Sequence, residues 1–247
     1  EWLRKAVEAV EESVRIYREL GVQGGLAGSL NNVSNRYSAL AGLETTREGR
    51  GEWLRKAVEA VEESVRICRE LGVQGDLAAS LTDVANRYSA LAGLETTRER
   101  RREWLRKAVE AVEEAIRIRR DLGVPGDLAI SLGTSCQIRR VRAENADDPD
   151  AALEDLRASR SAIAEAVGLF RESGNTRYFL QALRDVVTSD LALAQAGDEV
   201  DLTALRAVCE TGWELARSMQ DETQATFFDS VIRAVDEAEG SESTSED

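Results

Sequence analysis

The sequence EWLRKAVEAV, at residues 1–10, returns unchanged at residues 52–61 and again at residues 103–112. The repeated unit is 51 residues long, and residues 1–51 and 52–102 are identical at all but eight positions. Self-similarity at such a period is typical of solenoids, in which each unit buries its apolar face against its neighbours. The sequence therefore predicts a repeat array, a class of protein that usually binds other molecules rather than catalysing reactions.

Each unit contains two helical patterns. The first runs from Trp2 to Leu20, with apolar residues at steps of three and four that form one stripe of an amphipathic α-helix. On its polar face Glu11 and Arg15 are one turn apart and are expected to pair. The second pattern runs from about Gly25 to Ala41. Two helices per unit predict an all-α fold, a right-handed α-solenoid of antiparallel helix pairs.

A polar connection follows the second helix of each unit. It contains a possible capping box, Thr45 with Glu48, and its C-terminal part is expected to join the next helix. Trp2, Trp53 and Trp104 recur with the period at the start of the first helix, and we interpret them as residues that pack against the polar connection rather than as ligand platforms.

The chain is expected to contain three segments. Residues 1–143 hold the near-identical units. Residues 144–239 differ from them in sequence but keep apolar residues at the same 51-residue spacing, which predicts diverged helical repeats that continue the solenoid. Residues 240–247 are rich in serine and acidic residues and are predicted to be disordered. Because the chain begins inside a repeat and without methionine, we expect it to be part of a longer protein.

The composition excludes several classes of function. A net charge of −14 argues against nucleic acid or an anionic membrane as the main partner. The absence of histidine excludes catalytic triads and His-ligated metals within this chain, so we predict neither an enzyme nor a cofactor. The three cysteines lie far apart, and there is no signal peptide or membrane-length apolar run, which favours a cytoplasmic protein with reduced thiols. A local basic group is interpreted as a solvated helix start: Arg98, Arg100, Arg101, Arg102 and Arg106.

The repeat resembles the tetratricopeptide repeat, whose first helix reads approximately Trp/Leu-x-x-Leu-Gly-x-x-Tyr and whose second reads Ala-x-x-x-Phe-x-x-Ala. The corresponding residues of the first helix are Leu30, Val33, Ser34 and Tyr37, then Leu81, Val84, Ala85 and Tyr88. Those of the second are Ala57, Val61 and Ser64, then Ala108, Val112 and Ala115. The unit departs from the usual length of about 34 residues, and Ser135 and Arg139 break the pattern in the third copy. Long-linker arrays of this kind are similar to those found with bacterial CHAT proteases and signalling ATPases.

The resemblance implies that the helix containing Tyr37 lines a concave groove. It places polar side chains of successive units at the groove, and the expected peptide-binding residues are Asn31, Asn32, Asn35, Thr82, Asp83, Asn86, Gln137, Arg140 and Arg184. A row of amides, Asn35, Asn86 and Gln137, could pair with the backbone of an extended peptide. The alternative is that these amides contact neighbouring helices or water, and that the arginines pair with nearby glutamates.

Five of the eight differences between the first two units fall within this same helix, at residues 25, 28, 31, 32 and 34. An inner face that varies on a constant scaffold is what a binding array would show, although relaxed drift of a surface would look similar. Three functions are therefore weighed: a module that binds a peptide or protein segment, a scaffold that forms homo-oligomers through its repeat ends, and the sensor arm of a larger enzyme.

Overall fold

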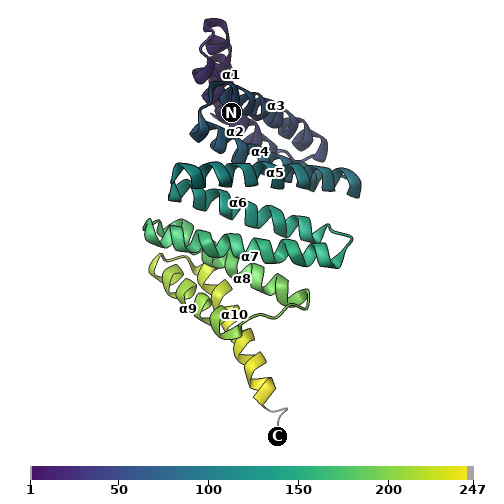
Figure 1. Cartoon of the computed structure of the whole chain (residues 1–247), viewed down its shortest axis with the longest axis vertical. Helices are drawn as coiled ribbons and strands as arrows, with labels where there is room; N and C mark the ends of the chain where they lie inside the picture. Colours follow the sequence, from purple (N-terminus) through teal and green to yellow (C-terminus); the bar gives the residue numbers. More distant parts are fainter. Residues whose placement is uncertain (1, 244–247) are drawn as a thin grey trace. The chain divides into compact units, whose positions relative to one another are not determined.

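The computed structural model of the chain describes residues 2–243, which form ten helices and no strand (Figure 1). The chain divides into two compact units, unit 1 at residues 1–146 and unit 2 at residues 147–247. The helices of unit 1 are α1 (Trp2–Leu20), α2 (Gln23–Leu43), α3 (Arg47–Leu71), α4 (Gln74–Leu94), α5 (Arg98–Leu122) and α6 (Pro125–Glu144). The all-α fold of consecutive helix pairs predicted from the sequence is confirmed.

The turn inside each helix pair has the same construction. Gly21, Gly72 and Gly123 adopt left-handed backbone conformations with φ of +68°, +70° and +63°. After the first of these glycines, the Val22 amide donates to the Tyr17 carbonyl at 3.1 Å, which satisfies a carbonyl at the end of α1. A side chain at a positive φ is strained, so the sequence Leu-Gly-Val is retained in all three units of this part of the chain.

Small residues lie where the helices of unit 1 approach closely. The Ser13 and Ser29 hydroxyls are 2.9 Å apart within the first pair, and those of Ser64 and Ser80 are 3.0 Å apart within the second. Ser64 also donates to the Ala27 carbonyl at 2.9 Å, which links α3 to the preceding pair. The buried hydroxyls are thereby satisfied while the helix backbones remain close.

The two rows of helices in unit 1 are packed differently. In the even-numbered row, α2 contacts α4 and α4 contacts α6 directly. In the odd-numbered row, side-chain ion pairs join α1 to α3 and α3 to α5. The even-numbered row is therefore the closely packed side of unit 1, and the odd-numbered row is the more open side.

The C-terminal part of the polar connection between pairs belongs to the next helix, as expected from the sequence. The helix α3 begins at Arg47, and its N-cap is Thr46, whose hydroxyl accepts from the Gly49 amide at 3.1 Å. The predicted capping box of Thr45 with Glu48 is therefore wrong by one residue.

Trp53 and Trp104 pack as interpreted, whereas Trp2 is 74% exposed. The Trp53 indole donates to Glu44 of the connection at 3.3 Å and lies 5.6 Å from the Tyr37 ring. Trp104 repeats this arrangement with Glu95 at 3.2 Å and with the Tyr88 ring at 5.4 Å. These contacts anchor the long connection to the helix pairs.

Unit 2 contains α7 (Pro149–Glu172), α8 (Thr176–Gln195), α9 (Leu202–Ser218) and α10 (Glu222–Ser243). The side chain of Phe228 is fully buried in its core, where it packs beside Gly212, Cys209 and Val187. Of the acidic tail that was predicted to be disordered, residues 240–243 belong to α10, and residues 244–247 lie outside the described residues. Continuation of the solenoid from unit 1 into unit 2 stays a prediction.

Candidate functional site

Eight of the nine expected binding residues lie in the even-numbered row of unit 1. Asn32, Asn35 and Gln137 are exposed, Asn86 and Arg140 are partly exposed, and Thr82 is buried. The ninth, Arg184, is on α8 of unit 2, where its guanidinium lies 4.6 Å from the centre of the Phe227 ring. The described arrangement therefore brings together the residues of α2, α4 and α6 only.

A polar cluster joins α2 to α4. The Arg87 guanidinium donates to the Asn35 side-chain oxygen at 2.5 Å. Burial raises the pKa of the neighbouring Asp83 carboxyl, while Arg87 and hydrogen bonds from Asn31 and Asn35 act in the opposite direction. Burial likewise lowers the pKa of Arg87, against the attraction of Asp83. Both shifts show that loss of water outweighs the attraction within the pair.

Arg87 was not among the residues expected from the sequence. Its position four residues after Asp83 is the spacing at which opposite charges meet on one helix face, and that spacing was the available signal. The first unit has Asn32 in place of this aspartate, and Arg36 there is exposed. The charged pair is therefore particular to the second unit.

A second polar contact joins α4 to α6. The Thr82 hydroxyl lies 2.9 Å from the Ser131 hydroxyl and donates to the Ala78 carbonyl at 2.9 Å. Arg119 of α5 donates to the same Ser131 at 2.5 Å and to the Asp127 carbonyl at 2.7 Å. Thr82 therefore contacts a neighbouring helix, as does Asn31. The alternative given for the amides, contact with a neighbouring helix, describes Asn35, whose side-chain oxygen accepts from Arg87 of α4.

One of the sequence differences in α2 has a steric explanation. A Cβ atom at Gly25 would overlap the ring of Tyr17. The second unit carries Asp76 at the corresponding position, and there the tyrosine is replaced by Cys68. Residues 17 and 25 thus differ together because they share one volume, and this difference carries no information about a ligand.

Two clefts open on the odd-numbered side of unit 1. The first cleft, with a volume of about 590 Å³, lies between α1 and α3 with α2 beneath it. The second cleft, of about 630 Å³, lies between α3 and α5 with α4 beneath it. The first is lined by Glu11, Val14, Arg15, Arg18, Glu19, Leu30, Val33, Tyr37, Lys56, Glu59, Ala60 and Glu63. Each residue that lines the second cleft is the same residue type 51 positions later, so the two clefts are chemically identical.

A tyrosine of the even-numbered helix lines each cleft. The Tyr37 hydroxyl donates to Glu11 at 2.6 Å, and the Tyr88 hydroxyl donates to Glu62 at 2.5 Å. Burial, followed by the hydrogen bond to the carboxylate, raises the pKa of both tyrosines well above the usual value. Both hydroxyls therefore remain protonated donors at neutral pH.

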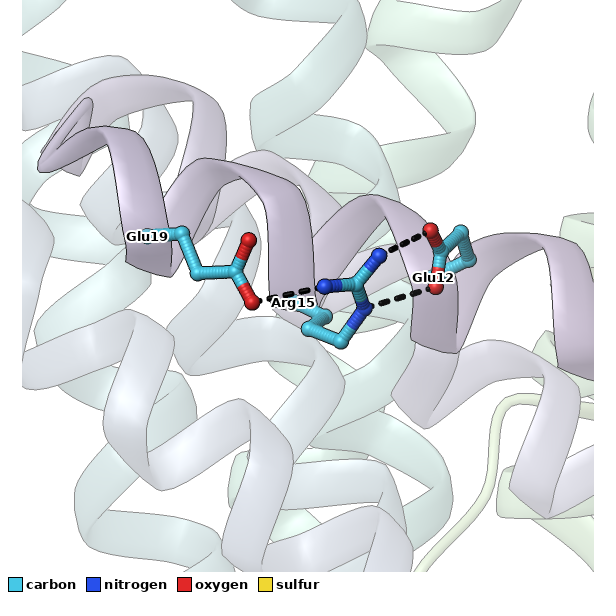
Figure 2. Close-up of polar contacts among 3 residues, drawn as sticks. All are labelled: Glu12, Arg15 and Glu19. Carbon is cyan, nitrogen blue, oxygen red and sulfur yellow. Dashed lines mark hydrogen bonds and ion pairs between the residues drawn. The ribbon is translucent and has the colours of Figure 1, made fainter.

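Arg15 does not pair with Glu11 as the sequence spacing indicated. Figure 2 shows its guanidinium between Glu12, at 2.5 and 2.8 Å, and Glu19, at 2.6 Å. Glu11 accepts the tyrosine hydroxyl instead. The prediction of this ion pair was wrong because a residue of the partner helix competes for the same carboxylate.

The basic group at the start of α5 serves the packing of unit 1. Arg101 donates to the Asn145 side chain at 2.8 Å and to the Glu95 carbonyl at 2.9 Å. Arg102 donates to the Asn145 carbonyl at 3.1 Å, and Arg106 pairs with Glu110 at 2.6 Å. Arg101 and Arg102 are partly buried, so the interpretation of this group as a solvated helix start is wrong for these two residues. It describes Arg98, Arg100 and Arg106, which are exposed.

Three further features of the described residues concern metal ions, membranes and the cysteines. Within residues 2–243 there is no cluster of three or more cysteine, aspartate or glutamate side chains placed to hold a metal ion. None of the helices in this range combines the length and apolarity needed to cross a membrane. The cysteines are buried, and burial raises the pKa of the Cys209 thiol to about 12.

No protein-family model matches the chain, and no curated protein matches it. Several solved structures share its fold. A kinesin light chain variant from Podosopora anserina with nearly identical TPR-like repeats has a TM-score of 0.58 at 16% identity, and the match covers 88% of each chain. A de novo designed helical repeat protein has a TM-score of 0.56 at 19% identity, covering 79% of this chain and 92% of its own. A signal transduction ATPase from Pyrococcus horikoshii with a tetratricopeptide repeat sensor has a TM-score of 0.56 at 15% identity; 95% of this chain matches 33% of that protein.

Proposed function

Because the chain has the fold of tetratricopeptide-like helical repeat proteins, we propose that unit 1 is a protein-interaction module that binds an extended peptide segment along its even-numbered row. The observation that carries this proposal is the row of amides at corresponding positions of successive helices, Asn35, Asn86 and Gln137. An amide presents both a donor and an acceptor, which is the chemistry of a peptide backbone. Such a module acts by binding rather than by catalysis, and we place it in the cytoplasm.

The exposed members of the row are the main contacts in this proposal. Asn32, Asn35, Asn86, Gln137 and Arg140 retain exposed surface. The side-chain oxygen of Asn35 also accepts from Arg87 of α4, so this residue joins the two helices as well as facing outward. The hydroxyl of Thr82 and the carboxylate of Asp83 serve contacts between helices, and they contribute indirectly by fixing the spacing of the row. Arg184 belongs to the site only if unit 2 continues the same row.

A displayed library of random peptides, selected against the full chain, supplies the probe for a test. The affinity of a selected peptide is then measured by fluorescence anisotropy for the wild type and for Asn35→Ala/Asn86→Ala. Loss of two hydrogen bonds, each contributing about 0.5–1.5 kcal/mol, is expected to weaken binding roughly tenfold or more. Glu59→Ala/Glu110→Ala, on the odd-numbered side, is the matched control, and helix content is compared by circular dichroism. Equal affinity of the two double variants would reject the proposal.

A second candidate function is assembly through the repeat ends. Val10 of α1 is partly exposed, whereas the corresponding Val61 and Val112 are completely buried. A helix like α2 or α4 from another chain would complete this face of α1. Sedimentation velocity of Val10→Glu against the wild type tests this candidate, which requires the wild type to associate and the variant to dissociate.

A role as the sensor arm of a larger enzyme is the third candidate. It rests only on the similarity in fold to a protein of which this chain spans a third. The complete reading frame, examined for an additional catalytic domain, would decide it.

A further inference from the structure

A row of exposed apolar side chains follows the C-terminal ends of the odd-numbered helices. Leu20, Leu71 and Leu122 end α1, α3 and α5 with 67%, 47% and 46% of their surface exposed. One residue beyond the glycine of each turn, Val22 and Val73 are 47% and 38% exposed. We refer to these five residues as the apolar edge. Exposed apolar side chains that gather on one surface, unlike those scattered singly, are typical of an interaction site.

The apolar edge follows one side of unit 1. Arg18, two residues before Leu20, reaches Glu63 of α3 at 2.8 Å. Arg69, two residues before Leu71, reaches Glu114 of α5 at the same distance. The C-terminal halves of the three odd-numbered helices therefore lie beside one another, and their leucines are arranged one per repeat.

The same side of unit 1 carries the two clefts. Glu19 lines the first cleft and Glu70 lines the second, and each is followed directly by a leucine of the apolar edge. The apolar part of the first cleft consists of Val14, Leu30 and Val33, with counterparts of the same type in the second. Protruding leucines thus alternate, with the same period on one surface, with clefts that have an apolar floor and a rim of charged side chains.

We propose that this surface binds a second copy of the chain side by side, with the apolar edge of each copy seated in the clefts of the other. The repeat sets both the spacing of the leucines along the apolar edge and the spacing of the clefts. The leucines of one copy can therefore meet both clefts of the other copy in a single register. A partner without this period would match one cleft and miss the next. The edge and the clefts are also adjacent, so one patch can be self-complementary about a two-fold axis, as an isologous dimer requires.

None of the eight differences between the first two units affects this surface. Every residue type that lines the first cleft is unchanged in the second, and the Leu-Gly-Val turns are identical. An exposed surface kept constant between repeats is what simultaneous contact at both clefts demands. This proposal concerns the odd-numbered side and does not depend on peptide binding by the even-numbered row.

Sedimentation velocity of the full chain over a concentration series tests the proposal. The wild type is expected to sediment as a dimer at the higher concentrations. Leu20→Glu/Leu71→Glu/Leu122→Glu is expected to remain monomeric with unchanged helix content by circular dichroism. The control is Leu43→Glu, which changes a leucine that is 71% exposed at the far end of α2 and should leave the dimer intact. A wild type that stays monomeric, or a triple variant that still dimerises, overturns the proposal.

Cross-linking provides a second test that does not depend on the triple variant. Leu71→Cys chains are mixed with affinity-tagged Glu59→Cys chains, and copper–phenanthroline removes two electrons and two protons to join the thiols. We expect more of the mixed disulfide than from Leu43→Cys with Glu59→Cys. Equal yields of the two mixed disulfides would contradict side-by-side docking. Association of the chains with no cross-link formed at the first cleft would also contradict it.

Discussion

Arg18 donates through Nη2 to both carboxylate oxygens of Glu63 at 2.8 Å and thereby joins α1 to α3 at the first cleft. Arg69 and Glu114 repeat the bridge at 2.8 and 2.9 Å between α3 and α5. The odd-numbered helices are thus linked by long side chains, while the even-numbered helices touch directly. Unit 1 is therefore more sensitive to ionic strength on one side than on the other.

Removal of both bridges should lower stability modestly. The arginine side chains are 54% exposed, so water screens the pairs and Arg18→Ala/Arg69→Ala is expected to lower the free energy of unfolding by about 0.5–2 kcal/mol at low salt. The difference from the wild type should shrink in concentrated salt, where the Debye length falls to about 3 Å at 1 M. Urea unfolding at both ionic strengths measures this, with the exposed Arg4→Ala as control. A difference that is independent of salt would show that packing of the arginine stems dominates.

Residues 17 and 25 should be energetically coupled. Gly25→Asp introduces a Cβ into the Tyr17 ring and is expected to destabilise by about 1–3 kcal/mol. The same substitution combined with Tyr17→Cys reproduces the second unit and should be tolerated much better. A double-mutant cycle by urea unfolding measures the coupling, and simple additivity of the two changes would contradict shared volume as their cause.

Two glycines of unit 2 should respond oppositely to alanine. A Cβ at Gly212 would overlap the buried ring of Phe228, whereas a Cβ at Gly168, inside α7, meets no atom within 4 Å. Gly212→Ala is expected to cost about 1–3 kcal/mol through overpacking. Gly168→Ala is expected to stabilise by up to about 1 kcal/mol because alanine favours the helix. Thermal unfolding followed by circular dichroism compares the stability of the two variants. A stabilised Gly212→Ala would show that Phe228 and its neighbours can shift to accommodate the added methyl group.

Asp83 should make stability increase as the pH falls. Because burial raises its pKa, the folded protein holds this proton more tightly than the unfolded chain does. Stability from this group therefore rises as the pH falls from neutral toward the usual aspartate value of about 3.9, and it is lost as the pH increases. The free energy of unfolding of the wild type minus that of Asp83→Asn is expected to increase as the pH is lowered over this range. Asp76→Asn, at an exposed position of α4, is the control, and a difference that shrinks on acidification would reverse the assignment.

The repeats determined the helix pairs without reference to the structure. The apolar stripe that ends at Leu20 predicted the C-terminal end of α1, because periodicity and the terminal glycine are local signals. Local sequence was less reliable at the polar connection, where Thr46 rather than Thr45 caps α3.

Contacts between helices were decided by the tertiary structure alone. Glu11 accepts from Tyr37 rather than from Arg15, and Arg87 meets Asn35, because helix packing brings together side chains that are 26 and 52 residues apart. The clefts and the apolar edge likewise exist only once the pairs are stacked. Sequence periodicity fixes which face of a helix is buried, since that depends on the spacing of a few neighbours. The partner of a polar side chain depends instead on how far apart the stacked helices stand, and this distance is set by the packing of the whole unit.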